Sequence, residues 1–288
     1  MVKRKLLVSV APLILILSIV AFKFYASYTA EKEVDKVVLD ISSLVYIEYE
    51  KVSVGFFSTK VNIENVVLLS LLDKQTTKID KIILGDFQKY QDESMPTYIK
   101  LIGIDSGAFE NPLVKKRLSE LEYQKVKFNL SIDYNYDQEE GELDIKEMSL
   151  ASDQVGALNL RLKVNNLDLQ PESIMSLPMT YTQTNIEKIE LEYKDHSLVE
   201  RLYKLQAASN NETVAEYKKN LADNAEKYVN DGNDKFIIDI VSNIKKFIER
   251  PNSIAIRIAP KKPISLQSII HIGDPKEIIR LLNIEVES

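Results

Sequence analysis

The chain of 288 residues contains no cysteine and only two histidines. Without cysteine, disulfide bonds, thiol catalysis and zinc–thiolate sites are excluded, so the fold must be stabilised by its core alone. The sequence also lacks a GxSxG nucleophile elbow, an HExxH zinc motif, a P-loop and a GxGxxG loop. These absences predict that the protein has no cofactor and no metal site, and that it is not an enzyme.

The two histidines do not alter this prediction. His196 is expected at the start of a helix, and His271 beside a Gly-Asp-Pro turn, with no nucleophile motif near either. Histidine serves in catalytic sites but is also a common packed residue, and we expect a structural role for both. A cleft that held either histidine together with carboxylates would instead favour an enzyme.

One acidic stretch, Asp133–Asp137, imitates the start of a calcium-binding loop. Such a loop needs glycine at its sixth position and glutamate at its twelfth, where this sequence has glutamine and aspartate. The same acidic residues are expected on the solvated side of a strand, opposite Ile132, Tyr134 and Tyr136. We therefore interpret the stretch as part of a strand.

Basic residues are too few in the main part of the chain to attract nucleic acid. The chain has 37 Lys+Arg against 43 Asp+Glu, and four of the basic residues lie in the first 30 positions, which contain no acidic residue. The remainder therefore carries a net charge of about −10. A body this acidic repels nucleic acid and anionic lipid headgroups, so we expect no nucleic-acid partner.

An apolar run follows the basic residues Lys3–Lys5. It extends from Leu6 to Tyr28 with Lys23 as its only charge. About 20 apolar residues cross the hydrocarbon core, and a lysine near one end can snorkel to the interface. The positive-inside rule places the N-terminus in the cytoplasm, and Tyr25 and Tyr28 suit the far interface. We expect a single-pass anchor in a bacterial inner membrane, with the C-terminal domain in the periplasm.

A cleaved signal peptide is the alternative for this segment. Cleavage requires small residues at positions −3 and −1. Cleavage after Ala30 would put Tyr28 at −3, and cleavage after Ala26 would put Phe24 there. Because both residues are bulky, we expect the mature protein to keep the anchor.

Strict alternation of apolar and polar residues predicts an antiparallel meander. It runs through Phe128–Tyr136, turns at Asp137–Gly141 and returns with a shift of phase that indicates a β-bulge near Glu147. Further strands are expected at Leu158–Val164 and Ile189–Tyr193, and the meander should have one polar and one apolar face. Strands are also expected at 45–54, 56–69, 78–87, 97–104, 254–258 and 284–287.

Helical periodicity dominates after residue 195. Ser197 and Glu200 match a capping box, and Asp234–Glu249 is a strongly amphipathic helix. Other helices are expected at 31–43 and 211–229, and at starts marked by Asn111-Pro112 and Asp274-Pro275. The sequence predicts an α+β fold: an N-terminal transmembrane helix, and a twisted antiparallel sheet with helices packed on it. The expected regions are the tip and anchor at 1–30, a mainly β region at 31–194 and a mainly helical region at 195–288 that completes the same domain.

The alternation defines an apolar sheet face that is the main functional candidate. Such a face is either a core covered by helices or an open groove, and an open groove can hold acyl chains. The helix at 234–249 has an apolar stripe of matching size, so we expect this helix to cover the face. The predicted face consists of Phe128, Leu130, Ile132, Tyr134, Leu158, Leu160 and Leu162.

The same helix offers a second candidate surface. Its apolar residues recur at helical spacing and share one side. If this side were exposed, it would serve as a docking surface for another protein. The candidate docking residues are Phe236, Ile240, Ile244 and Phe247.

Two segments resemble known envelope families. The basic N-terminus, the single anchor and a strand pair with Tyr49 before Gly55–Val61 resemble bacterial YdgA-like membrane-anchored periplasmic proteins. The stretches Gly141–Ile145 and Gly156–Leu160 are similar to β-repeats of AsmA-like proteins. The first resemblance implies an inner-membrane-anchored periplasmic protein without established catalytic residues, and the second implies lipid handling in the envelope.

Two functions remain open at this point. One is a non-enzymatic envelope protein that binds a partner or an amphipathic ligand, such as a lipid, on its sheet. The other is an accessory or scaffold subunit of an envelope membrane complex that docks through its helices. An open apolar groove would favour the first function, and an exposed apolar stripe on the helix at 234–249 would favour the second.

Overall fold

A computed structural model of the protein describes residues 26–36, 38–39, 42, 45–55, 59–71, 74–90, 93–106, 112–167, 183–227 and 234–288. The chain divides into two compact units, residues 1–111 (unit 1) and 112–288 (unit 2), and each is described by itself. The apolar run predicted as an anchor lies outside the described residues except for its last few positions. Within the described ranges, no helix has the length and apolar character needed to cross a membrane.

Unit 1 is an antiparallel sheet with a helix packed against it. Two short strands, β1 (Val45–Glu48) and β2 (Lys51–Val54), pair end to end with β3 (Val61–Ser70). β3 then pairs with β4 (Thr76–Tyr90), and β4 with β5 (Glu93–Ser106). The core of the unit is formed by Val52, Ile63, Val66 and Ile79.

The helix formed by residues 26–36 is fixed to this sheet. Its Ala30 and Val34 pack against the core. The backbone N–H of Val54 donates to Ser27 Oγ at 3.1 Å, and the Tyr49 hydroxyl donates to the carboxylate of Asp35. The predicted helix at 31–43 is thus confirmed at residues 31–36 and 38–39, and it begins earlier than expected.

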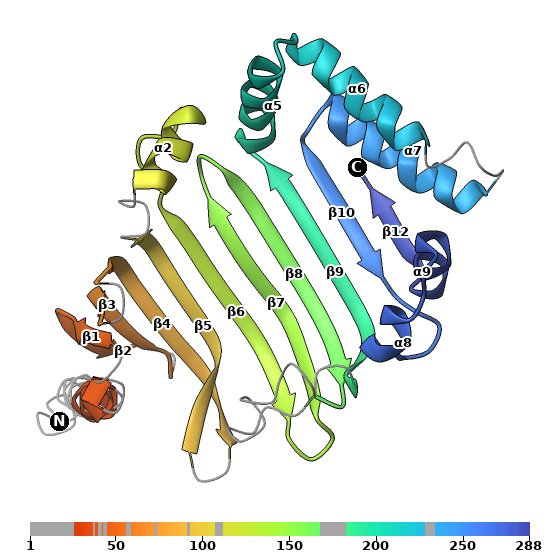
Figure 1. The fold of residues 1–288 in the computed structure, drawn as a ribbon. Coiled ribbons are helices and arrows are strands. Elements are labelled where there is room, and N and C mark those ends of the chain that lie inside the picture. Colours follow the sequence, from red (N-terminus) through yellow and green to blue (C-terminus); the bar gives the residue numbers. More distant parts are fainter. Residues whose placement is uncertain are drawn as a thin grey trace, which may run out of the picture. The chain divides into compact units, whose positions relative to one another are not determined.

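Unit 2 contains the predicted meander, extended at one edge (Figure 1). Four consecutive strands pair in order: β6 (Phe128–Asp137), β7 (Glu142–Ser152), β8 (Gly156–Asn165) and β9 (Asn185–Asp195). β10 (Ser253–Ile258) pairs with β9, and β12 (Ile284–Glu287) with β10; the short β11 (Ile264–Ser265) also pairs with β9. All these pairings are antiparallel, so the predicted α+β class with a large antiparallel sheet is confirmed.

The predicted bulge in β7 is confirmed. Ile145 pairs with Leu162 and Met148 pairs with Leu160, so two residues of β7 lie opposite one residue of β8. The extra residue restores the phase of the apolar side chains. Both halves of β7 therefore present their apolar residues to the same side of the sheet.

The helices of unit 2 follow the sequence prediction, except for a short helix at Leu266–Ile270 that was not predicted. α2 (Pro112–Glu120) precedes the sheet, and α5 (Leu198–Ser209), α6 (Val214–Lys227) and α7 (Lys235–Glu249) follow β9. α8 (Leu266–Ile270) and α9 (Pro275–Leu281) connect the last strands. α7 packs on α6 and lies against β12 and β10 (Figure 1).

The predicted capping box at Ser197 is wrong. The Ser197 hydroxyl donates to the carbonyl oxygen of Gln154 at 2.6 Å, and the carboxylate of Asp195 accepts from the Val199 N–H at 3.0 Å. The capping box occurs one helix later, where Glu216 N–H donates to Thr213 Oγ1 at 3.2 Å and Thr213 N–H donates back to Glu216. Ser197 therefore ties α5 to the β7–β8 turn.

Candidate functional site

The register of β6 to β9 assembles the predicted apolar face in unit 2. Residues paired directly across antiparallel strands point to the same side of a sheet, and alternate residues of one strand do so too. All seven predicted residues therefore lie on one side. Phe128 begins β6, and the other six form three rows with their partners: Leu130, Leu150, Leu158 and Tyr193; Ile132, Met148, Leu160 and Leu191; and Tyr134, Ile145, Leu162 and Ile189.

Sequence reasoning missed the contributions of β7 and β9 to this face. Met148 and Leu150 lie beyond the bulge, which shifts their phase, so alternation alone does not align them with β6. Leu191 and Tyr193 lie in a strand that was predicted, but its place beside β8 depends on pairing. The alternation within Ile189–Tyr193 was the only sequence signal that these residues share an apolar side of their strand.

Helix α7 covers the edge of the face rather than its centre. Phe247 of α7 contacts Tyr193 edge to face, with the ring centroids 6.4 Å apart, and the helix lies over β10 and β12. We expected this helix to cover the face from Phe128 to Leu162. That expectation is wrong for β6 to β8, because the helix reaches only the edge strands. The physical reason is the added edge: β10 and β12 supply their own apolar side chains for α7 to pack on.

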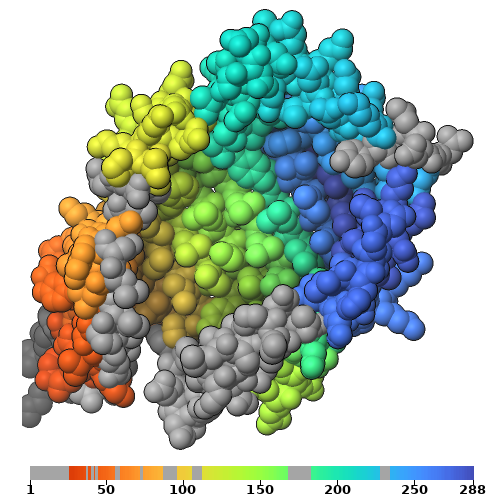
Figure 2. All heavy atoms as spheres, in the orientation of Figure 1, coloured from red at the N-terminus to blue at the C-terminus, as the bar shows by residue number. Residues whose placement is uncertain are grey.

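The apolar face remains partly exposed on its two middle strands. None of the seven predicted residues is buried, and the directly paired Leu150 and Leu158 are each 38% exposed. Figure 2 shows this side of the molecule, with a hollow over the green strands β7 and β8 next to the helices α5 to α7. Burying a leucine side chain stabilises a protein by about 1.5–3 kcal/mol, so this exposed pair makes the face a candidate site for binding an apolar ligand.

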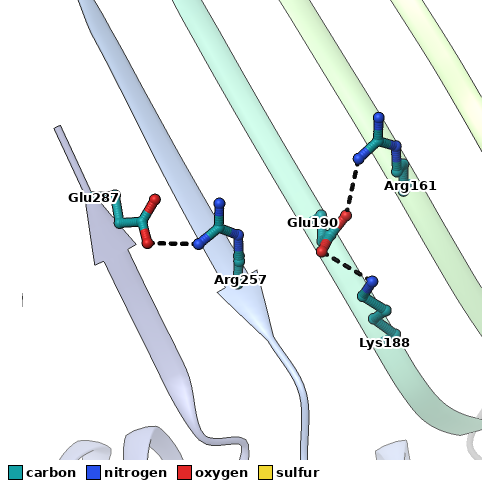
Figure 3. Close-up of polar contacts among 5 residues, drawn as sticks. All are labelled: Arg161, Lys188, Glu190, Arg257 and Glu287. Atoms are coloured by element: carbon teal, nitrogen blue, oxygen red, sulfur yellow. Dashed lines mark hydrogen bonds and ion pairs between the residues drawn. The ribbon is translucent and has the colours of Figure 1, made fainter.

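The opposite side of the same strands is charged and solvated (Figure 3). Glu190 pairs with Lys188 at 2.9 Å and with Arg161 at 3.3 Å, and Arg257 pairs with Glu287 at 2.5 Å. The hydrogen bond from Lys188, together with the one from Arg161, lowers the pKa of Glu190. These ion pairs are exposed, so this side of the sheet faces water. Exposed ion pairs of this kind contribute about 0–1 kcal/mol each to stability.

A polar cluster closes the apolar face where β9 ends. The Tyr193 hydroxyl donates to Asp195 at 2.6 Å, and the hydroxyls of Tyr123 and Ser197 lie 2.8 Å apart. Arg201 stacks over the Tyr123 ring at 4.4 Å and donates to the Leu121 carbonyl at 2.7 Å. Burial raises the pKa of the Tyr193 hydroxyl, and the hydrogen bond to Asp195 raises it further. These groups are bonded to one another, so the cluster acts as a structural end wall.

The buried Tyr203 of α5 makes the stability of unit 2 depend on pH in the alkaline range. Burial, and secondly the charge of Glu200, raises the pKa of Tyr203 to about 12. The folded state therefore keeps this proton to higher pH than the unfolded state, whose tyrosines titrate near pH 10. Stability is unaffected below about pH 10 and is lost as the pH rises towards 12, by up to about 1.4 kcal/mol per pH unit.

We expect Tyr203→Phe to reduce this alkaline loss. Urea unfolding of the wild type and the variant at about pH 9 and about pH 11 should show a larger fall in unfolding free energy for the wild type. Tyr49 and Tyr193 titrate in both proteins, so the difference between the two falls isolates Tyr203. An equal fall in unfolding free energy for the wild type and the variant would contradict the raised pKa of Tyr203.

Both histidines bond to backbone carbonyl oxygens. His196 Nδ1 lies 3.1 Å from the Ser152 oxygen, and His271 Nδ1 lies 2.7 Å from the Gln267 oxygen. In the calcium-like stretch, Asp137 accepts from the N–H groups of Glu139 and Glu140 and so shapes the turn. Across the described part of the chain, no three His, Asp or Glu side chains are grouped so that they could hold a metal ion.

The candidate docking helix packs within its own unit. Ile240 is buried, as are Ile237, Val241 and Ile248 of the same stripe, and Phe236, Ile244 and Phe247 are half-buried. Ile238, on another side of α7, is 40% exposed. The apolar stripe is therefore used to attach α7 to its neighbours.

Comparison with known proteins yields two similarities. A family model described as "Uncharacterized protein" matches residues 149–288, which include β8 to β12 and the helices α5 to α9. A protein of Aquifex aeolicus (strain VF5), also described as "Uncharacterized protein", is 22% identical over 226 residues. That similarity covers 73% of this chain and 74% of the relative.

Proposed function

We propose that the protein is a single-pass, membrane-anchored periplasmic protein that binds a lipid through its acyl chains on the apolar sheet face of unit 2. The proposed role is binding and not catalysis. The observation that carries this proposal is the exposed Leu150–Leu158 pair, which lies on the two middle strands in the first of the three apolar rows. The helix α7 packs at the edge of the sheet, over β10 and β12, and Figure 2 shows a hollow over the green strands beside the helices.

The dimensions of the face suit an acyl chain. Successive rows are two residues apart along each strand, so the first and third rows lie about 13 Å apart, and β6 to β9 together span about 14 Å. The side chains in these rows are aliphatic except for Tyr134 and Tyr193. An acyl chain requires apolar contact and no hydrogen bonds, and a hollow surface fits a narrow, flexible chain better than it fits a flat protein surface.

The sequence supports a location at a membrane. The apolar run Leu6–Tyr28 behind a basic cluster is long enough to cross a bilayer and is oriented with its N-terminus in the cytoplasm. The resemblance to envelope proteins points the same way. The alternative of a scaffold subunit receives less support, because the stripe on α7 packs against α6, β10 and β12.

We expect Leu158→Asp to abolish lipid binding while leaving the fold intact. Leu158 is exposed enough for a carboxylate to remain hydrated, but the charge would lie in the path of an acyl chain. The matched control is Asn159→Asp, which adds the same group to the next residue on the charged side of the strand. The full chain is extracted in mild detergent, and co-purifying lipid is measured by native mass spectrometry.

The control should retain lipid at the wild-type level, and Leu158→Asp should bind it at least about tenfold more weakly, a loss of about 1.4 kcal/mol or more. Thermal unfolding of both variants confirms that each is folded. Equal lipid content in the two folded variants would show that the face does not bind lipid.

A further inference from the structure

The helix of residues 26–36 connects the predicted anchor directly to the sheet of unit 1. Ser27 lies within the last residues of the apolar run, and its side chain already accepts from Val54 N–H at 3.1 Å. One turn later, Ala30 packs against the core of the unit, followed by Val34. The sheet is therefore attached where the apolar run ends, because the first residues after the run are part of the folded unit.

The pairing of the strands identifies which end of the sheet is attached. Val54 pairs with Val61, Val61 with Leu84, and Leu84 with Ile99. Tyr98 pairs with Gly85, one residue beyond this row, where β2 and β3 have ended and β4 and β5 continue as a two-stranded ribbon to Tyr90 and Glu93. We call this the Ser27–Val54 end. Tyr46 pairs with Leu69, eight residues along β3 from Val61, which corresponds to about 26 Å. Tyr46 therefore marks the far end of the same sheet.

Two lysine–tyrosine pairs lie at the Ser27–Val54 end. The Lys32 ammonium is 4.7 Å from the centre of the Tyr28 ring, and the Lys60 ammonium is 3.7 Å from the centre of the Tyr98 ring. Tyr28 is 57% exposed. Tyrosine rings collect at the level of lipid headgroups, and lysine extends its ammonium from there into water.

We propose that the Ser27–Val54 end of unit 1 is a membrane-contact surface, with Tyr28 and Tyr98 at the headgroup layer of the bilayer that holds the anchor. The partner is the phospholipid surface itself. This inference rests on the proposed function, because it requires the apolar run to cross the membrane. β1, β2 and β3 then lead away from the bilayer, with Tyr46 about 26 Å further out, and the β4–β5 ribbon beyond Tyr98 lies along the headgroup layer.

The absence of tryptophan from the chain permits a test with a single fluorophore. Tyr28→Trp, Tyr98→Trp and Tyr46→Trp are each made in the full chain and reconstituted in phosphatidylcholine vesicles, with and without lipid that carries a doxyl quencher near the headgroup. Tyr46 is the matched control, because it is 53% exposed against 57% for Tyr28. We expect loss of emission at positions 28 and 98, and unchanged emission at 46.

Extraction with alkaline carbonate separates the two ways in which the inference can fail. A protein that carbonate releases from the vesicles has no membrane anchor, and both the proposed location and the contact surface are then wrong. A protein that remains in the vesicles, but is quenched no more at 28 and 98 than at 46, is anchored without seating unit 1 on the bilayer. That result would overturn the contact surface alone.

Discussion

Replacement of Ile240 by aspartate is expected to unfold unit 2. Ile240 is 8% exposed and belongs to the stripe through which α7 packs on its neighbours. An aspartate there would be a buried charge without a partner, which costs about 3–5 kcal/mol. This is a large part of the 5–15 kcal/mol by which a typical domain is stable. Urea unfolding monitored by circular dichroism measures the change.

The control for this substitution lies two residues earlier on the same helix. Ile238 is 40% exposed, so Ile238→Asp adds the same charge where water can solvate it. Its effect should stay within about 0.5–1 kcal/mol. If Ile240→Asp remains as stable as Ile238→Asp but loses a co-purifying protein, then the stripe is a docking surface and its assignment to the core is wrong.

Replacement of Gly156 by alanine is expected to destabilise unit 2 by about 3 kcal/mol, near the upper limit for a strained backbone position. Gly156 begins β8 with φ +152°, a conformation that residues with a side chain rarely adopt. An added Cβ would lie 2.6 Å from the carbonyl oxygen of Lys194, and 3.0 Å from the Tyr193 hydroxyl. The backbone of β9 is held by pairing on both sides, so it cannot move away easily.

The matched substitution for Gly156 is Gly273→Ala in the same unit. No atom lies within 4 Å of the Cβ that this change would add. Its unfolding free energy should remain within about 0.5 kcal/mol of the wild type. If Gly156→Ala loses no more unfolding free energy than Gly273→Ala, then movement of β9 relieves the close approach at Gly156.

The strands of the meander were predictable because one side of each strand is apolar. Phe128 to Tyr136 alternates without interruption, and the structure forms β6 there. The bulge near Glu147 was also predictable, since an interrupted alternation resumes with its phase shifted by one. Asp234 was predicted as the first residue of α7, and its carboxylate accepts from Phe236 N–H at 3.0 Å as the helix N-cap. These features depend on neighbours in the sequence.

The cover of the apolar face was not predictable from the same patterns. Periodicity shows that a helix has an apolar side, but it does not say which strands that side will meet. α7 packs on β10 and β12, two strands that follow it in the chain and add a new edge to the sheet. Likewise, Ser197 has the residue type of a cap, but long-range contacts with Gln154 and Tyr123 occupy its hydroxyl.

The strand order of unit 2 has a consequence for how the unit forms. β6, β7, β8 and β9 each pair with the strand that follows, so the sheet can grow by successive hairpins as the chain emerges. Pairing between successive strands gives a lower contact order than pairing between distant strands would, which favours faster folding. β10 and β12 join only after α5, α6 and α7 have been added, because these helices precede them in the chain. We therefore expect vectorial folding: a hairpin stage that exposes the whole apolar face, and a final docking stage that covers its edge.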